Sequence, residues 1–220
     1  YLLGGHRSIF FDYMDATGVT RYLPVLVYPK GAPDKAAYIG HRLEKHQTQV
    51  APLWTPETQT STSGSAEAMQ KAVDYIRKAG LKAKRVGVEA PFLPSDAAAV
   101  LGRGLPESEM KDGVFVLERL RAVKRPDELE LLRRASELVI ESMLTVMTKH
   151  GPGTTKRELF EALRREEVNR GMTFEYCLLT AGSSLNRAPS EQRWETGEII
   201  SLDSGGNYQG YIADVCRMAI

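Results

Sequence analysis

The chain has 220 residues, of which 42% are hydrophobic and 26% are charged. This is the composition of an ordinary globular protein, and it excludes a disordered tail, a collagen and a coiled coil. The 29 basic and 28 acidic residues give a formal net charge of +1, so nothing indicates a nucleic acid or an anionic membrane as a partner. The longest apolar runs are also too short to span a bilayer.

The chain has two cysteines, Cys177 and Cys216. Two are too few for a disulfide scaffold or a cysteine-rich zinc site, so we expect a reduced, cytoplasmic protein. The sequence opens at Tyr1 rather than at a methionine, and it stops at Ile220 inside a predicted strand. We therefore expect it to be a fragment of a longer protein.

Residues 1–120 mix strand and helix patterns and predict one small α/β domain. The predicted strands are Val19–Tyr28, Lys35–His41, Arg85–Glu89 and Val114–Leu117. A Ser/Thr/Gly loop over Ser61–Ser65 leads into a helix over Ala66–Ala79 that Gly80 ends, and a short helix over Asp96–Leu101 has Ser95 as a plausible N-cap.

Residues 121–220 have a different pattern. Pro126 followed by acidic residues predicts the start of a long helix that ends at Gly151-Pro152-Gly153. Thr155-Lys156-Arg157-Glu158 fits a capping box for a second helix, which runs to about Arg170 with Gly171 as its C-cap. The remaining predicted elements are strands over Phe174–Thr180 and Glu198–Asp203, a tight turn marked by Gly205-Gly206-Asn207 and Gly210, and a return strand over Tyr211–Ala219.

Asp203 and Asp214 each lie in an apolar strand on either side of this turn. A hairpin that pairs residue 203 with residue 214 would place both carboxylates on one face, with Cβ atoms ~5 Å apart. Two such carboxylates repel each other unless solvent, a shared proton or a cation offsets the repulsion. A pair of divalent metals bridged by carboxylates is the most productive arrangement chemically. The alternative is an aspartate that solvates a hairpin or makes a local turn bond.

Several segments resemble the pita-bread metallohydrolases, the family of Xaa-Pro aminopeptidases, prolidases, methionine aminopeptidases and creatinase. The hairpin carries the most specific part of this resemblance, with Leu202-Asp203-Ser204-Gly205-Gly206, then Gly210-Tyr211-Ile212-Ala213-Asp214 and Arg217. Arg121–Leu129 resembles the linker and first helix of the family's catalytic domain. Pro152-Gly153-Thr154 with Glu158-Leu159 resembles the entry to its second helix, and Gly197-Glu198-Ile199-Ile200 the step before its first ligand. Tyr1-Leu2-Leu3-Gly4-Gly5 and the following domain resemble the creatinase-like N-terminal domain.

The resemblance implies an α/β creatinase-like domain over residues 1–120 and the first half of an α+β pita-bread domain over residues 121–220. Asp203 would chelate one metal and Asp214 would bridge two, in a pair of Mn, Co, Zn or Fe ions. The family completes this site with one histidine and two glutamates further downstream, beyond residue 220. We therefore expect the 220 residues to lack most metal ligands and to be inactive alone. The resemblance also implies a homodimer.

One position departs from the family pattern. In the peptidases a histidine precedes the turn before the first aspartate and helps to bind the reacting carbonyl, and Asn186 takes its place here. An asparagine amide can donate a hydrogen bond to a developing oxyanion, but it cannot shuttle a proton as histidine does. Alternatively, Asn186 only starts the turn over Arg187–Ser190.

These features favour a metal-dependent hydrolase of C–N bonds, foremost an Xaa-Pro dipeptidase or aminopeptidase acting on peptides. A creatinase-like hydrolase of small molecules is the first alternative, because the missing histidine matters less there. A non-catalytic relative that serves as a binding or scaffold protein is the second. The other chemically capable side chains show no ligand spacing: we expect His6, His41, His46 and His150 at the surface or at helix ends, and Cys216 in a core.

Overall fold

The computed structural model describes residues 24–220 and the backbone of Leu2–Leu3. The chain divides into two compact units, Tyr1–Val123 and Lys124–Ile220. Each unit has its own hydrophobic core, so each is described separately. In the described residues, no helix combines the length and the apolar character needed to cross a membrane.

The first unit is a mixed six-stranded sheet with the strand order β4-β3-β2-β1-β5-β6. Its strands are β1 (Leu2–Leu3), β2 (Val25–Val27), β3 (Ala37–His41), β4 (Glu57–Thr62), β5 (Arg85–Val88) and β6 (Glu109–Asp112). Its α-helices are α2 (Lys45–Val50), α3 (Ser65–Lys78), α4 (Ser95–Gly104) and α5 (Val114–Ala122), and short 3₁₀ turns cover Pro33–Lys35, Arg42–Glu44 and Ala90–Phe92. The pairs β1–β2 and β2–β3 are antiparallel, whereas β3–β4, β1–β5 and β5–β6 are parallel.

Most predicted elements of this unit are present with shifted ends. Helix α3 buries the apolar face that its spacing predicts, and Gly80 ends it with φ +64°. Helix α4 is longer than predicted and begins at Ser95, with Pro94 rather than Ser95 at the N-cap. The predicted loop over Ser61–Ser65 is wrong at its start, because β4 continues to Thr62, whose Oγ1 donates to the Gly40 carbonyl at 2.8 Å. Residues 19–23 of the first predicted strand lie outside the described residues.

The predicted strand over Val114–Leu117 is wrong. These residues begin helix α5, where Asp112 Oδ1 accepts a hydrogen bond from the Val114 backbone N–H at 3.0 Å. The strand is instead the preceding polar segment β6, which pairs in parallel with β5 at the edge of the sheet. Phe115 and Val116 remain exposed. Tertiary pairing with β5 therefore outweighs the β propensity of this apolar run.

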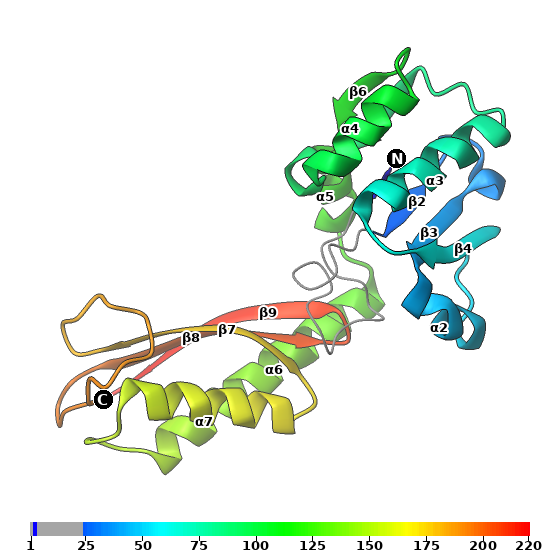
Figure 1. Ribbon diagram of the computed structural model, residues 1–220. Coiled ribbons are helices and arrows are strands. Elements are labelled where there is room, and N and C mark those ends of the chain that lie inside the picture. Colours follow the sequence, from blue (N-terminus) through cyan, green and yellow to red (C-terminus); the bar gives the residue numbers. More distant parts are fainter. Residues whose placement is uncertain (1, 4–23) are drawn as a thin grey trace. The chain divides into compact units, whose positions relative to one another are not determined.

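The second unit consists of two helices on one face of an antiparallel sheet (Figure 1). The helices are α6 (Pro126–Lys149) and α7 (Lys156–Asn169), and the strands are β7 (Thr173–Ala181), β8 (Ile200–Tyr208) and β9 (Tyr211–Ala219). Helix α6 packs against β8 and β9, and α7 packs against β7. The predicted capping box is confirmed, since Thr155 Oγ1 accepts from the Glu158 N–H at 3.1 Å and Glu158 Oε2 accepts from the Thr155 N–H at 2.8 Å.

The hairpin exists as predicted, but its register is two residues away from the predicted one. Strand β8 runs through Gly205-Gly206-Asn207, and the turn lies at Gln209-Gly210. Residue 203 therefore pairs with Cys216, and Asp214 pairs with Gly205. The prediction that 203 and 214 are direct partners is wrong, because the two turn residues with positive φ are Gln209 (53°) and Gly210 (89°). Positive φ at both central residues defines the tight hairpin turn.

Candidate metal centre

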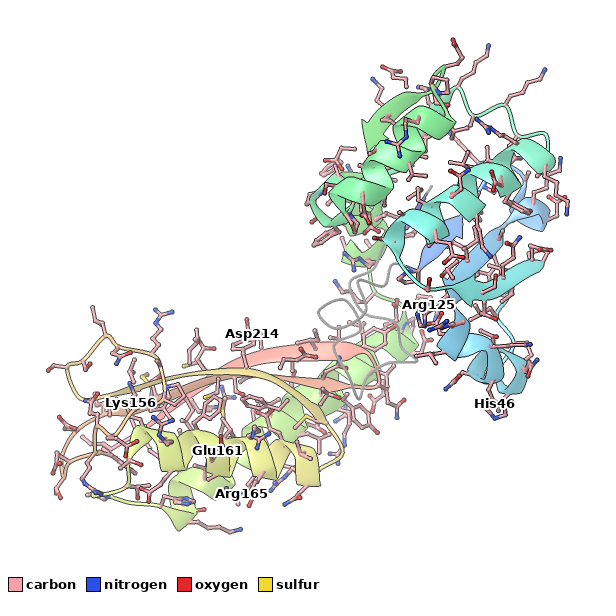
Figure 2. All side chains as sticks on the ribbon, in the orientation of Figure 1. His46, Arg125, Lys156, Glu161, Arg165 and Asp214 are labelled. Atoms are coloured by element: carbon pink, nitrogen blue, oxygen red, sulfur yellow. The ribbon has the colours of Figure 1, made fainter. Side chains whose placement is uncertain are left out.

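Asp203 and Asp214 lie on the same face of the second sheet. Paired residues of antiparallel strands share a face, and so do residues two apart on one strand. Asp203 faces Cys216, which is two residues from Asp214, so the two aspartates are diagonal neighbours. Figure 2 shows Asp214 on the side of the sheet away from α6 and α7. The two carboxylates therefore occupy the open face of the sheet.

The environment of Asp203, including Asp214, affects its ionisation. Burial raises the pKa of Asp203, and the charge of Asp214 and a hydrogen bond between the two side chains raise it further. The guanidinium of Arg187 acts in the opposite direction and lowers the pKa of Asp203. Asp203 is half-buried and Asp214 is exposed. Two carboxylates this close are stabilised either by a shared proton or by a cation.

Tyr176 reaches the same centre from β7. It pairs with Gly205, which in turn pairs with Asp214 on the other side. A Cβ atom on Gly205 would collide with Cε1 of Tyr176, so the ring passes over this glycine. Burial raises the pKa of Tyr176, and a hydrogen bond to Asp214 raises it further. Glycine at position 205 thus allows the phenol to reach across one strand and orient Asp214.

This donor set fits a divalent cation, but it is incomplete. Carboxylate oxygens are suitable ligands for such ions, and a cation would remove the repulsion that raises the pKa of Asp203. Within residues 24–220, no group of three or more His, Cys, Asp or Glu side chains could hold a metal. Asp203 and Asp214 could therefore supply two ligands of a metal centre, but not a complete set.

Asn186 lies in the loop between β7 and β8 and is exposed. Its Oδ1 accepts a hydrogen bond from the Ala188 N–H at 3.0 Å, which is a local turn bond. The neighbouring Arg187 carbonyl accepts from the Leu179 N–H of β7 at 3.0 Å. Asn186 thus starts the turn, as the alternative interpretation predicts, and its amide Nδ2 is the group that can donate to a ligand.

Other predicted side chains have simple structural positions. Cys216, predicted in a core, is instead exposed beside Asp203, and its Sγ lies 3.3 Å from Ser201 Oγ. His41 is buried at the N-cap of a 3₁₀ turn, where Nδ1 accepts from the Leu43 N–H at 3.3 Å. His46 is exposed and His150 caps the end of α6. His6 lies outside the described residues.

Sequence reasoning missed three residues around this centre, namely Tyr176, Lys156 and Glu167. Lys156 and Glu167 are both fully buried although they are charged types. Nothing in their local spacing distinguishes them from the exposed charged residues of the same helix. For Tyr176, the small residues Gly205-Gly206 inside an apolar strand were the available signal, because a glycine in a strand indicates close approach of another group.

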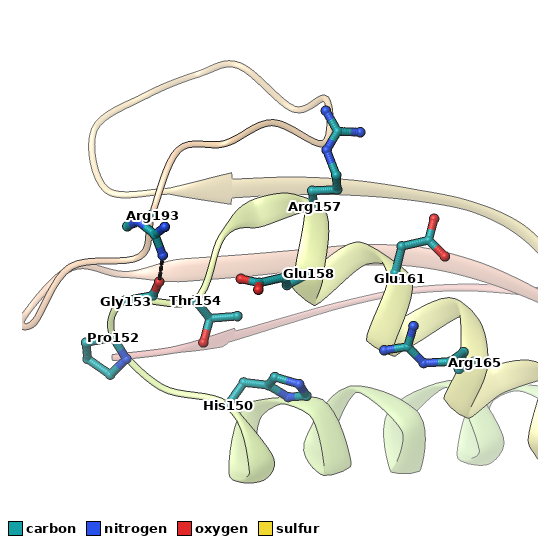
Figure 3. A pocket seen from close by; sticks show the side chains of 9 residues that line it. All are labelled: His150, Pro152, Gly153, Thr154, Arg157, Glu158, Glu161, Arg165 and Arg193. Carbon is teal, nitrogen blue, oxygen red and sulfur yellow. Dashed lines mark hydrogen bonds between the residues drawn. The ribbon is translucent and has the colours of Figure 1, made fainter.

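A separate pocket of about 640 Å³ lies where α6 connects to α7 (Figure 3). It is lined by His150, Pro152, Gly153, Thr154, Arg157, Glu158, Glu161, Arg165 and Arg193. Several of its charges are already paired: Glu158 closes the capping box, Arg157 Nε lies 2.7 Å from Glu191 Oε1, and Arg193 donates to the Gly153 carbonyl. These pairs account for much of its charge and do not involve the aspartates.

The match to a known protein family lies in the second unit. Residues 130–220 match the sequence profile of metallopeptidase family M24. This match covers less than half of the chain, so it shows a likeness of residues 130–220 to that family. The chain is 22% identical to the uncharacterized peptidase YqhT of Bacillus subtilis (strain 168), over 84% of this chain and 52% of that protein. It is also 22% identical to an Xaa-Pro dipeptidase of Pyrococcus horikoshii, over 95% of this chain and 62% of that protein.

A solved structure shows that the similarity in fold extends beyond this segment. The prolidase from Pyrococcus horikoshii OT3 has a TM-score of 0.77 at 17% identity, and the match covers 100% of this chain and 59% of that one. The chain as a whole therefore has a mixed α/β fold shared with these enzymes. It matches between half and two thirds of the length of these relatives.

Proposed function

We propose that the protein is a metal-dependent hydrolase of C–N bonds that acts on Xaa-Pro peptides, as a dipeptidase or an aminopeptidase. The observation that carries this proposal is the pair Asp203 and Asp214, which share one face of the second sheet and in which the charge of Asp214 raises the pKa of Asp203. The similarity to an Xaa-Pro dipeptidase and to a prolidase supports the substrate class.

Each residue of the centre has a role in this proposal. Asp203 and Asp214 would hold a pair of divalent metals, and Tyr176 would keep Asp214 oriented through its hydroxyl. When bound, such metals act as Lewis acids toward a carbonyl and make water acidic near neutral pH. The Asn186 amide would donate a hydrogen bond to the carbonyl oxygen of the substrate, where negative charge develops.

The same proposal includes the larger organisation expected from the sequence. Residues 1–120 would be a creatinase-like N-terminal domain, and residues 121–220 the first half of a pita-bread catalytic domain. The complete protein would be a cytoplasmic homodimer. The free thiols of Cys177 and Cys216 agree with a reducing compartment.

Metal titration tests the carboxylate pair directly. We expect Asp203→Asn and Asp214→Asn each to lower Mn²⁺ affinity by about tenfold or more, because each removes one anionic ligand. Isothermal calorimetry on the 220-residue chain measures the affinity. Asp127→Asn is the control, since this exposed carboxylate pairs with Arg125 at 2.7 Å on α6. Equal affinities in all four proteins would refute the proposed centre.

Asn186 favours a second candidate, a creatinase-like hydrolase of small guanidino or amide compounds. Its Oδ1 is committed to the turn and it cannot carry a proton, as a peptidase histidine would. We expect Asn186→His in the full-length protein to leave kcat/KM on Xaa-Pro dipeptides unchanged at matched metal loading if this candidate is right. A rise of about 10²–10⁴-fold, the usual contribution of proton transfer, would identify a peptidase that lacks its histidine.

A further inference from the structure

Lys156 is a fully buried lysine at the start of α7, with 0% of its surface exposed. Its Nζ donates a hydrogen bond to the backbone carbonyl of Asn186. Burial lowers the pKa of this ammonium. Burying a charge costs free energy unless the charge is hydrogen-bonded. The hydrogen bond to Asn186 therefore offsets part of the cost of burying the Lys156 ammonium.

The loop after Asn186 lies along the first turn of α7. The Lys156 N–H donates to the Gln192 carbonyl at 2.9 Å, and the Arg157 N–H donates to the Ser190 carbonyl at 3.0 Å. On its other side the loop is bound to β7, where the Leu179 N–H donates to the Arg187 carbonyl at 3.0 Å. The Lys156 ammonium adds a side-chain hydrogen bond to the carbonyl of Asn186, the residue at which the chain enters this loop.

The position of this loop sets where Arg187 lies relative to the aspartates. The backbone of Arg187 is bonded to β7 at Leu179, next to Leu178, which pairs directly with Asp203 on β8. Leu179 pairs with Leu202, directly before Asp203 on β8. The Leu179–Arg187 bond therefore places the Arg187 backbone level with Asp203 along the strands. A shift of the loop would therefore change the distance between this cation and the metal ligands.

We propose that Lys156 is a positioning residue that fixes Asn186 and Arg187 beside Asp203. Its buried ammonium holds the Asn186 carbonyl, and the Leu179–Arg187 hydrogen bond holds the next residue against β7, near Asp203. The purpose of this arrangement rests on the proposed function, whereas the restraint on the loop does not. The competing explanation is that Lys156 only fills the core between α7 and the loop.

Amide hydrogen exchange separates these two explanations. We expect Lys156→Met to accelerate exchange at the Leu179 N–H by about 10- to 100-fold, the effect of losing one charged hydrogen bond on local opening. Exchange at Val139, in the core of α6, should not change, because methionine keeps the apolar stem and removes a buried charge. Lys149→Met is the matched control, since Lys149 forms an exposed pair with Glu166 at 3.2 Å.

Unchanged exchange at Leu179 would overturn the proposal. Equal acceleration at Leu179 and Val139 would also overturn it, because this pattern reports global destabilisation rather than release of the loop. Since this readout needs no metal and no substrate, it remains decisive even if the chain binds no Mn²⁺ and the proposed function fails.

Mn²⁺ affinity then tests whether Lys156 acts through Arg187. We expect Arg187→Gln to raise Mn²⁺ affinity by about two- to fivefold, because it removes a positive charge that would repel a metal ion bound at Asp203. Lys156→Met should raise it in the same direction, and the double variant should equal Arg187→Gln alone. Multiplicative effects in the double variant would show that Lys156 acts independently of Arg187 and would overturn this link.

Discussion

Glu167 is a buried carboxyl beneath the strand that carries Asp203. It is 0% exposed, and its Oε1 accepts a hydrogen bond from Ser204 Oγ at 2.8 Å. Its Oε2 has no hydrogen-bond partner among the residues that the structure describes. Burial raises the pKa of Glu167 from 4.5 to about 7. Ser204 Oγ also lies 2.8 Å from the Tyr176 carbonyl oxygen, so this polar pair lies on the reverse side of the candidate metal centre.

This pKa makes stability depend on pH. Below pH 4.5 Glu167 is protonated in the native and unfolded states, so its ionisation costs nothing. As pH rises from 4.5 to about 7, the unfolded state ionises while the native state stays protonated, so the native state loses stability and the cost levels off at about 3 kcal/mol above pH 7. Glu167→Gln should therefore match the wild type at pH 4.5 and exceed it by about that amount at pH 8.

Urea denaturation at pH 4.5, 6 and 8 measures this difference. Glu195→Gln provides the control, because Glu195 is exposed in the loop before β8. A constant difference between Glu167→Gln and wild type at all three pH values would contradict the assigned ionisation.

The β8–β9 hairpin is the element that brings the carboxylates together. Its turn has Gln209 at φ 53° and Gly210 at φ 89°, both in the left-handed region. The Gly210 N–H donates to Asn207 Oδ1 at 2.8 Å, and Tyr211 Oη donates to Glu128 Oε1 at 2.9 Å on α6. The turn therefore sets the register of the hairpin, and Tyr211 attaches it to the helix.

Gln209 is the unfavourable position in this turn, because a side chain disfavours positive φ. Among residues other than glycine, asparagine tolerates positive φ best. We expect Gln209→Asn to stabilise the protein by about 0.5–1 kcal/mol. Thermal denaturation of the chain followed by circular dichroism would show a higher midpoint. Gly210→Ala is the opposite case and should lower the midpoint. A decrease in both variants would mean that the turn has a different geometry.

At the scale of the whole molecule, two units with separate cores carry different parts of the fold. The candidate metal centre lies entirely on the second unit, in the segment that matches metallopeptidase family M24. The described residues contribute two carboxylates to it and no third ligand of the same kind. Two monodentate anions on a sheet hold a divalent ion only weakly.

We therefore expect the 220 residues by themselves to bind Mn²⁺ or Co²⁺ with dissociation constants above about 1 μM, and to hydrolyse no Xaa-Pro dipeptide. Calorimetry and a dipeptide assay on the isolated chain measure both properties. Metal-dependent turnover by this chain would show that the 220 residues form a complete site.

The sequence alone determined the features that depend on near neighbours in the chain. Pro126 and the apolar stripe defined α6, and Thr155 with Glu158 defined the start of α7, because capping groups and helix periodicity act within one or two turns. The alternation of β8 and β9 also placed Asp203 and Asp214 on one face, since a shift of the register by two residues does not change the face.

Only the tertiary structure decided features that depend on distant residues. It assigned Val114–Leu117 to a helix because β6 takes the place beside β5. It also buried Lys156 and Glu167, whose partners Asn186 and Ser204 lie 30 and 37 residues away in the chain. Whether a charged side chain is buried depends on which segments pack over it, and local hydrophobic periodicity contains no information about such partners.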